Sequence, residues 1–218
     1  MTALLANLSQ GDEVIMPSYT FVSTANAFCL RGATPVFVDI REDTLNLDEK
    51  LVPEAITENT KAIVGVHYAG VACEPYKLRE IAQAHGLLFI EDAAQALGAR
   101  YDGRPLGSFG DMGALSFHET KNVISGEGGA LLLNDESLIS RAEILRDKGT
   151  NRKSFLRGER AKYTWVDLGS SYLPGEMVAA FLFAQLKHLS AITQKKIEIW
   201  NRYHEALYPL EQEGILRR

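Results

Sequence analysis

The sequence predicts an α/β protein whose mostly parallel sheet carries helices on both faces. Two observations support this fold class. Short β-branched and aliphatic runs alternate with stretches of helical length, and polar residues follow the apolar runs directly. The 218 residues are 46% hydrophobic and 23% charged, so the chain can bury one sizeable core. We expect a sheet domain over residues 1–175 and a long helix over residues 176–212.

The predicted strands are six short apolar runs, each of a length typical of a strand. Only a short segment separates the fifth run from the sixth, whereas a helical crossover between parallel strands needs about a dozen residues or more. We therefore expect the last two strands to be antiparallel or to be joined by an open loop. The runs are EVIMP (13–17), PVFVD (35–39), AIVGVH (62–67), LLFIED (87–92), GALSFH (113–118) and GALLLN (129–134).

The predicted helices lie between these runs. Glycines at positions 32 and 86 end two of them, because glycine readily takes the left-handed conformation that closes a helix. Pro53 weakens a third helix, since it interrupts the early turns. The predicted helices cover 18–31, 48–58, 75–85 and 135–148, and a long polar loop covers 151–172.

The C-terminal part repeats apolar side chains at helical spacing, which predicts one long amphipathic helix, either straight or bent. Polar residues such as Gln194, Lys195 and Lys196 stand between the apolar ones. The apolar positions are Val178, Phe181, Leu182, Leu189, Ile192, Ile199, Trp200, Tyr203 and Leu207.

Charge and composition argue against several classes of partner. The net charge is -5 and no block of Lys and Arg is present, so we expect no nucleic-acid partner. Cys29 and Cys73 lie in separate apolar segments, as buried thiols do in a reducing compartment, which favours the cytoplasm. The first residues lack a cationic signal region and no apolar run approaches membrane-spanning length, so we expect no membrane partner.

Candidate ligand-binding residues stand at the ends of the predicted strands. Ligands of an open α/β sheet bind beyond the carboxyl ends of its strands. Asp92 and Gln95 stand at the end of the fourth run, Ser116 near the end of the fifth, and Phe21 after the first. These positions predict that the four side chains meet at one edge of the sheet. A single Asp or Ser at such a position more often caps a helix or hydrogen-bonds to backbone groups.

Lys121 follows the fifth run in a loop that also contains glycines. A lysine at such an edge can act as a nucleophile or as a Schiff-base partner. Asp92, facing it, could hold a pyridinium nitrogen protonated, as pyridoxal phosphate requires. The alternative is a solvated loop lysine, which most lysines are. The sequence has no dinucleotide, P-loop or nucleophile-elbow motif, and no His/Cys spacing that predicts a metal site.

Several segments together resemble the pyridoxal-phosphate-dependent sugar-nucleotide aminotransferases of the DegT/StrS family, which have the fold type I large domain. The segments are GDEVIMPSYTFVSTANAFCLRGATPVFVDI, VHYAG, IEDAAQALGA and GSFGDMGALSFHETKN followed by GEGGALLLND. The resemblance covers essentially the whole chain.

The resemblance implies that pyridoxal 5′-phosphate is the cofactor and assigns its contacts residue by residue. Lys121 matches the lysine that forms the Schiff base and moves the proton. Asp92 matches the carboxylate that pairs with the pyridine nitrogen. Gln95 matches a position at the ring hydroxyl or ring face, Phe21 the aromatic residue that stacks on the ring, and Ser116 a phosphate ligand. Dehydratases of the family have a histidine in place of Lys121, so the lysine argues against that branch.

The resemblance also implies a substrate and an assembly. PSYTFVSTANAF, FHETKN and YTWVDLGSSYL are most similar to family members that transfer an amino group from glutamate to a TDP-4-keto-6-deoxyhexose, in lipopolysaccharide or enterobacterial common antigen biosynthesis. The implied partners are a sugar nucleotide, an amino-acid donor and a second copy in a homodimer. A relative that acts on a 3-keto sugar nucleotide is an alternative.

Family members carry further segments at both ends of the region that this chain matches. They have a strand and a Ser/Thr-containing turn before the position of Met1, and a small domain after the long helix. We therefore expect residues 1–175 to form a partial cofactor-binding large domain, and residues 213–218 to begin a small domain that the chain lacks. This expectation leaves a second hypothesis open, namely an inactive fragment that keeps only the fold and the dimer surface.

Overall fold

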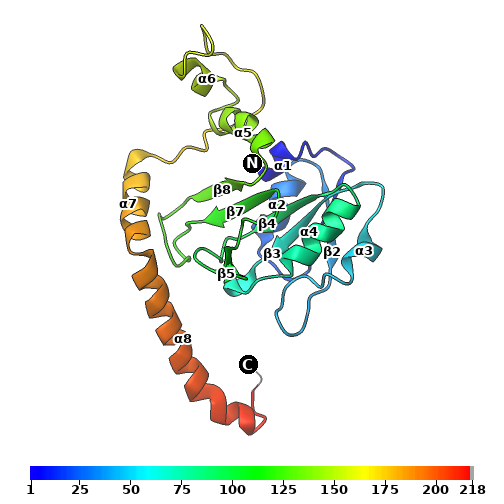
Figure 1. Cartoon of the computed structure of the whole chain (residues 1–218), viewed down its shortest axis with the longest axis vertical. Helices are drawn as coiled ribbons and strands as arrows, with labels where there is room; N and C mark the ends of the chain where they lie inside the picture. Colours follow the sequence, from blue (N-terminus) through cyan, green and yellow to red (C-terminus); the bar gives the residue numbers. More distant parts are fainter. Residues whose placement is uncertain (217–218) are drawn as a thin grey trace.

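A computed structural model, which describes residues 1–216, contains a six-stranded sheet with helices on both faces (Figure 1). The strand order is β2-β1-β3-β4-β7-β8. The first five strands are parallel, and β8 pairs antiparallel with β7. The predicted fold class is therefore confirmed, and of the two expected arrangements for the last strands the antiparallel one is present. The strands are β1 (Glu13–Pro17), β2 (Thr34–Val38), β3 (Thr60–Val66), β4 (Leu88–Asp92), β7 (Met112–Ser116) and β8 (Gly129–Leu133).

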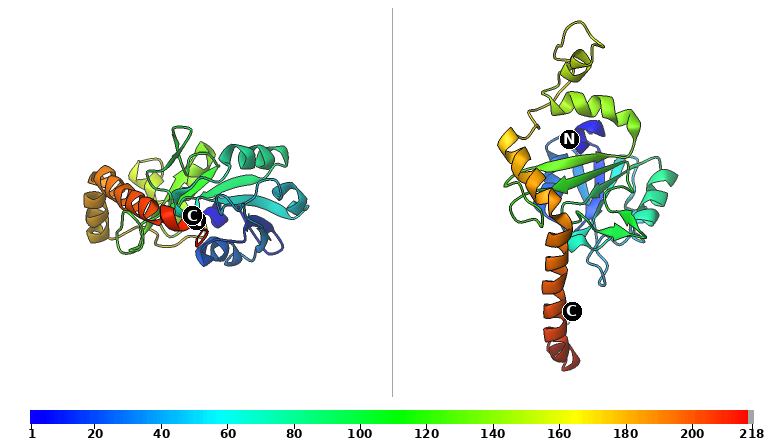
Figure 2. Two further views of the ribbon diagram at one scale, coloured as in Figure 1. Left: turned by 90° about the horizontal axis from the view of Figure 1, so that it is seen from below. Right: turned by 60° about the vertical axis from the view of Figure 1, so that its left-hand side comes forward.

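Each face of the sheet has its own buried core, because successive side chains of a strand point to opposite faces. In β1, Val14 and Met16 pack with the core under α1, α2 and α5, whereas Ile15 packs with the core under α3 and α4. Figures 1 and 2 show these helices on the two sides of the sheet. The helices are α1 (Thr2–Leu5), α2 (Val22–Cys29), α3 (Val52–Ala55), α4 (Pro75–Ala84) and α5 (Ile139–Arg146).

The observed helices are shorter than the predicted ones. The helix α2 begins at Val22 instead of Ser18, because residues 18–20 form a bend after β1, and Phe21, the residue before the helix, has an extended backbone with a φ of -79° and a ψ of 146°. The helix predicted over 48–58 is reduced to α3, where Pro53 occupies the first turn. The segment 135–148 divides into a 3-10 turn, η2 (Glu136–Leu138), and α5.

Two small features were not predicted. A two-stranded hairpin of β5 (Arg100–Tyr101) and β6 (Arg104–Pro105) turns at Asp102 and Gly103, which have φ values of 48° and 76°. A 3-10 turn, η1 (Tyr68–Gly70), follows β3. The hairpin turn is an Asp-Gly pair, the type of sequence that favours positive φ in tight hairpins.

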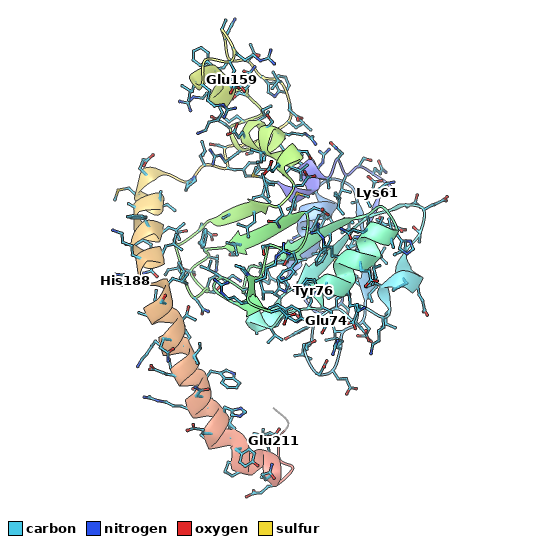
Figure 3. All side chains as sticks on the ribbon, viewed as in Figure 1. Lys61, Glu74, Tyr76, Glu159, His188 and Glu211 are labelled. Atoms are coloured by element: carbon cyan, nitrogen blue, oxygen red, sulfur yellow. The ribbon has the colours of Figure 1, made fainter. Side chains whose placement is uncertain are left out.

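The C-terminal part has a short helix that was not predicted, and its long helix is interrupted once. The polar loop contains a short helix, α6 (Arg152–Leu156), and the helical residues 176–212 form two helices, α7 (Glu176–Lys187) and α8 (Leu189–Gln212). They meet at His188, labelled in Figure 3, whose φ of -106° and ψ of 11° interrupt the helix. Figures 1 and 2 show α8 extending away from the sheet.

Two of the terminal residues assigned to a further domain, 217 and 218, lie outside the described residues. The division into domains stays a prediction. Within residues 1–216, no helix is both long enough and apolar enough to cross a membrane.

Candidate active site

All five predicted site residues line one cavity of about 620 Å³. The cavity lies beyond the carboxyl ends of β3, β4 and β7, where a doubly wound sheet binds its ligands. A neighbouring cavity of about 390 Å³ shares Gln95, Ser116 and Lys121 with it. Side chains that are 100 residues apart in the chain therefore face a common space. The five residues are Phe21, Asp92, Gln95, Ser116 and Lys121.

Asp92 is the last residue of β4, and both of its carboxylate oxygens accept a hydrogen bond. Oδ1 accepts from the backbone N–H of Ala94 at 3.0 Å. Oδ2 accepts from the hydroxyl of Thr24 on α2 at 2.7 Å. Each carboxylate oxygen has a second lone pair, so Asp92 can still accept a proton donor from a ligand in the cavity.

Gln95 is held by the turn after β3. Its Oε1 accepts a hydrogen bond from the backbone N–H of Ala69 at 2.7 Å. Ala69 has a φ of 53° inside η1, a left-handed conformation that aims this N–H at the amide oxygen. Because the oxygen is used by the backbone, the side-chain NH₂ of Gln95 remains as a donor toward the cavity.

Lys121 lies in a tight loop that extends the β7–β8 hairpin. Its backbone N–H donates to the carbonyl of His118 at 2.9 Å, and the N–H of Glu119 donates to the carbonyl of Gly126 at 2.8 Å. The side chain of Lys121 is half-buried. Nζ of Lys121 makes no hydrogen bond or ion pair with any of residues 1–216, so the amine is available to a ligand.

The glycines near Lys121 allow this loop to close. Gly126 has a φ of +84°, in the left-handed region that side chains disfavour. Gly129 has its α-carbon so close to β7 that a β-carbon would lie 2.6 Å from the carbonyl oxygen of Leu115. The positive φ therefore favours glycine at position 126, and the close approach of β7 requires glycine at position 129.

Ser116 and His118 lie on either side of the end of β7. The hydroxyl oxygen of Ser116 accepts from the N–H of His118 at 3.3 Å, which leaves its proton for another acceptor. Nδ1 of His118 accepts from the backbone N–H of Thr120 at 3.2 Å, so this nitrogen carries no proton. The Nε2–H of His118 then faces Oε1 of Glu127 at 3.6 Å.

Aromatic residues surround the mouth of the cavity. Phe21 is 66% exposed, which is unusual for a phenylalanine and leaves one ring face open to a ligand. The rings of Tyr19 and Tyr68 are in contact, with 4.5 Å between their centroids. The hydrogen bond with Tyr19 raises the pKa of Tyr68. Tyr68 and Phe21 both line the cavity.

A buried pair of side chains, Glu91 and His67, supports the strand ends at the cavity. Glu91 precedes Asp92, so its side chain points to the other face of β4. Its carboxylate accepts from Nε2 of His67 at 2.9 Å and from three backbone N–H groups of the segment 107–110. Nδ1 of His67 accepts from the N–H of Cys73 at 3.3 Å, so Nε2 is the nitrogen that donates to Glu91.

The pKa of Glu91 reflects two opposing effects. Burial raises the pKa, because it removes water from the charged form. The hydrogen bonds from His67, Gly110 and Gly107 lower it, and their sum prevails, so the pKa lies below the ordinary value of 4.5. Glu91 is therefore ionised and serves as a fixed acceptor. Burial likewise raises the pKa of the Cys73 thiol far above its ordinary value, which makes this thiol inert.

Two residues that shape the site, Thr24 and Glu91, were not singled out from the sequence. Thr24 stands in an ordinary helical stretch, and nothing in the sequence relates it to Asp92, which is 68 positions away. Glu91 did carry a signal, since an acidic residue at the end of the apolar run LLFI either faces solvent or finds buried partners.

Comparison with known proteins gives a consistent result along the chain. Residues 1–217 match the model of the DegT/DnrJ/EryC1/StrS aminotransferase family. The chain is 37% identical over 214 residues to an uncharacterized protein, MJ1066, of Methanocaldococcus jannaschii, which covers 97% of this chain and 55% of that protein.

Solved structures are similar over the same region. An aminotransferase from Psychrobacter cryohalolentis has a TM-score of 0.90 and 35% identity, covering 97% of this chain and 55% of that one. DesI, solved in the presence of its TDP-sugar product, has a TM-score of 0.75 and 40% identity, covering 87% of this chain and 46% of that one. The chain thus spans about half the length of the relatives that it matches.

Proposed function

The chain belongs to the DegT/DnrJ/EryC1/StrS aminotransferase family, and we propose that it forms the cofactor-binding part of an enzyme that moves an amino group from glutamate to a TDP-4-keto-6-deoxyhexose. The family is pyridoxal-phosphate-dependent. The observation that carries the proposal is that Lys121 and Asp92, from different elements, line the same cavity.

The residues present fit the cofactor's requirements. The amine of Lys121 is unpaired among the described residues, a carboxylate with spare lone pairs stands across the cavity at Asp92, and Phe21 offers an open ring face. Gln95 and Ser116 each keep a donor for a ring hydroxyl or a phosphate oxygen. Pyridoxal phosphate, when bound, supplies an electron sink for the carbon that loses or gains the amino group.

Each residue then has a chemical task. Lys121 would hold the cofactor through Nζ and would move the proton at the donor's α-carbon. Asp92 would accept the hydrogen bond of the protonated pyridine nitrogen. Phe21 would stack on the ring, and Gln95 and Ser116 would orient it through hydrogen bonds.

Support for the substrate comes from the TDP-sugar product named for DesI and from the resemblance of the motifs to transaminases that form TDP-4-amino-4,6-dideoxygalactose. The finer proposal includes a homodimer in the cytoplasm, a large domain over residues 1–175 with the helix over 176–212 leading to a small domain, and a role in lipopolysaccharide or enterobacterial common antigen synthesis. A 3-keto sugar nucleotide is the competing substrate to assay.

The experiment is an absorbance spectrum of the purified chain with pyridoxal phosphate, before and after borohydride reduction, followed by mass mapping of the adduct. We expect a visible absorption band and one reduced pyridoxyl group on Lys121. Lys121→Ala should show no adduct and an unchanged circular dichroism spectrum. A folded chain that takes up no cofactor, or an adduct on another lysine, would refute the proposal for this chain.

A further inference from the structure

A chain of hydroxyl groups leads from the wall of the cavity to the carboxylate of Asp92. The hydroxyl oxygens of Thr20 and Thr24 are 2.8 Å apart, and the hydroxyl of Thr24 is 2.7 Å from Oδ2 of Asp92. Both distances are short and typical of hydroxyl hydrogen bonds. Thr20 lies in the bend before α2, Thr24 lies inside α2, and Asp92 ends β4.

The direction of this chain follows from the chemistry of its members. An ionised carboxylate only accepts hydrogen bonds, so the single hydroxyl proton of Thr24 goes to Oδ2 of Asp92. The oxygen of Thr24 is then the acceptor in its contact with Thr20, whose proton it receives. The hydrogen bonds therefore run from Thr20 through Thr24 to Asp92, and each of the two hydroxyl groups donates its proton once.

Thr24, which lies between Thr20 and Asp92 in this series of hydrogen bonds, is buried. Thr24 is 6% exposed, so water cannot readily replace its hydroxyl beside the carboxylate. Asp92 is held at its other oxygen by the N–H of Ala94, at 3.0 Å. One contact on each oxygen fixes the rotation of the carboxylate plane, whereas the Ala94 contact alone would leave that plane free to turn.

We infer that Thr24 is a positioning residue for Asp92, and that Thr20 supports it in turn. This inference rests on the proposed function, in which Asp92 faces the cofactor ring. Thr24 sets the plane in which the carboxylate meets the ring nitrogen. Since Thr20 adjoins Phe21 in the chain, the same segment that offers a stacking face also braces the carboxylate beneath it.

The first test needs no cofactor. A crystal structure of the apo chain with Thr24→Val, which keeps the shape and removes the hydroxyl, is compared with that of the unchanged chain. We expect the carboxylate of Asp92 to rotate away from its orientation in the unchanged chain, and Thr24→Ser to restore that orientation. An Asp92 that keeps its orientation in Thr24→Val would overturn the inference.

The second test measures the dissociation constant for pyridoxal phosphate by quenching of intrinsic fluorescence. We expect Thr24→Val to bind about tenfold more weakly, in line with the loss of one charge-assisted hydrogen bond, and Thr24→Ser to bind nearly as the unchanged chain does. Thr164→Val, in an exposed loop outside the cavity, is the matched control and should change nothing. Equal affinities of Thr24→Val and the unchanged chain would contradict the inference.

The two tests separate two failures. If the unchanged chain binds no pyridoxal phosphate, the proposed function fails, and the apo structures still decide whether Thr24 orients Asp92. If the unchanged chain binds the cofactor and Thr24→Val behaves identically in both tests, the proposed function stands and the positioning role is wrong.

Discussion

Oε1 of Glu91 lies 2.9 Å from Nε2 of His67, and both side chains are fully buried. The same carboxylate accepts from the backbone N–H groups of Gly107, Phe109 and Gly110. This contact ties the end of β3 to β4 and to the segment before β7, the three strands whose ends form the cavity. The cavity therefore depends on a buried charge that does not touch it.

Glu91→Gln should destabilise the chain by about 3 kcal/mol, because an amide group presents two donors where three backbone N–H groups and one imidazole need acceptors. Urea unfolding followed by circular dichroism measures this loss. Glu80→Gln, in an exposed ion pair with Lys77, is the matched control and should have little effect. Similar midpoints for the two variants would show that the buried acceptor does not stabilise the fold.

The pKa of the Glu91 carboxyl also predicts how the stability of the fold depends on pH. The pKa of Glu91 is lower in the folded chain than its ordinary value of 4.5, so its contribution to stability is fully present above about pH 4.5. The contribution is lost as the pH falls through the folded-state pKa. The difference in unfolding free energy between the unchanged chain and Glu91→Gln should therefore narrow below about pH 4.5. A difference that stays constant down to pH 3, measured by urea unfolding at each pH, would contradict this assignment.

Lys121→Ala should abolish the proposed transamination, since no other described lysine lines the cavity. The assay follows formation of 2-oxoglutarate from glutamate in the presence of a TDP-4-keto-6-deoxyhexose, and in parallel a 3-keto sugar nucleotide. Lys77→Ala, on the exposed face of α4, should leave the rate unchanged. Turnover retained by Lys121→Ala would remove the lysine from the proposed mechanism.

Phe21→Ala should weaken binding of pyridoxal phosphate by about tenfold while leaving thermal stability nearly unchanged, because the ring is 66% exposed in the absence of a ligand. Phe37→Ala is a close control, since Phe37 is 56% exposed on β2 and does not line the cavity. Cofactor titration and thermal unfolding of both variants give the two readouts. An equal loss of affinity in both variants would argue against stacking by Phe21.

Two glycine variants should differ in how much they destabilise the fold. Gly129→Ala places a β-carbon 2.6 Å from the carbonyl of Leu115 and should force β7 and β8 apart, with a loss above about 2 kcal/mol. Gly126→Ala meets no atom within 4 Å, and only its φ of +84° is unfavourable, which costs about 1 kcal/mol. Thermal unfolding ranks the two. If Gly126→Ala lowers the unfolding temperature more than Gly129→Ala does, then the close approach of β7 and β8 does not limit the side chain at position 129.

The six strands of the large sheet and the shared edge of the site could be predicted from the sequence, because apolar runs and the residues that follow them are local signals, whereas the β5–β6 hairpin was not predicted. The long-range contacts could not. Nothing in the sequence relates Thr24 to Asp92, since the pairing arises only when α2 packs on the face of β4 to which Asp92 points. Helix ends were missed for a similar reason, as residues 18–20 bend instead of continuing α2, and Thr20 and Phe21 line the cavity. The break at His188 has no glycine or proline to announce it.

Adjacent carboxylates on β4 have opposite surroundings, and this contrast has a consequence for the alignment of the strand. A slip of β4 by one residue would exchange the faces to which its side chains point. In one direction, Asp92 would face the backbone amides at 107–110, which its shorter side chain would not reach, and Ala93 would take its place at the ligand space. In the other direction, Glu91 would take the place of Asp92, and Ile90 would face the amides. The backbone amides that bind Glu91 thus fix the register of β4. In this register, Asp92 is the carboxylate that faces a ligand.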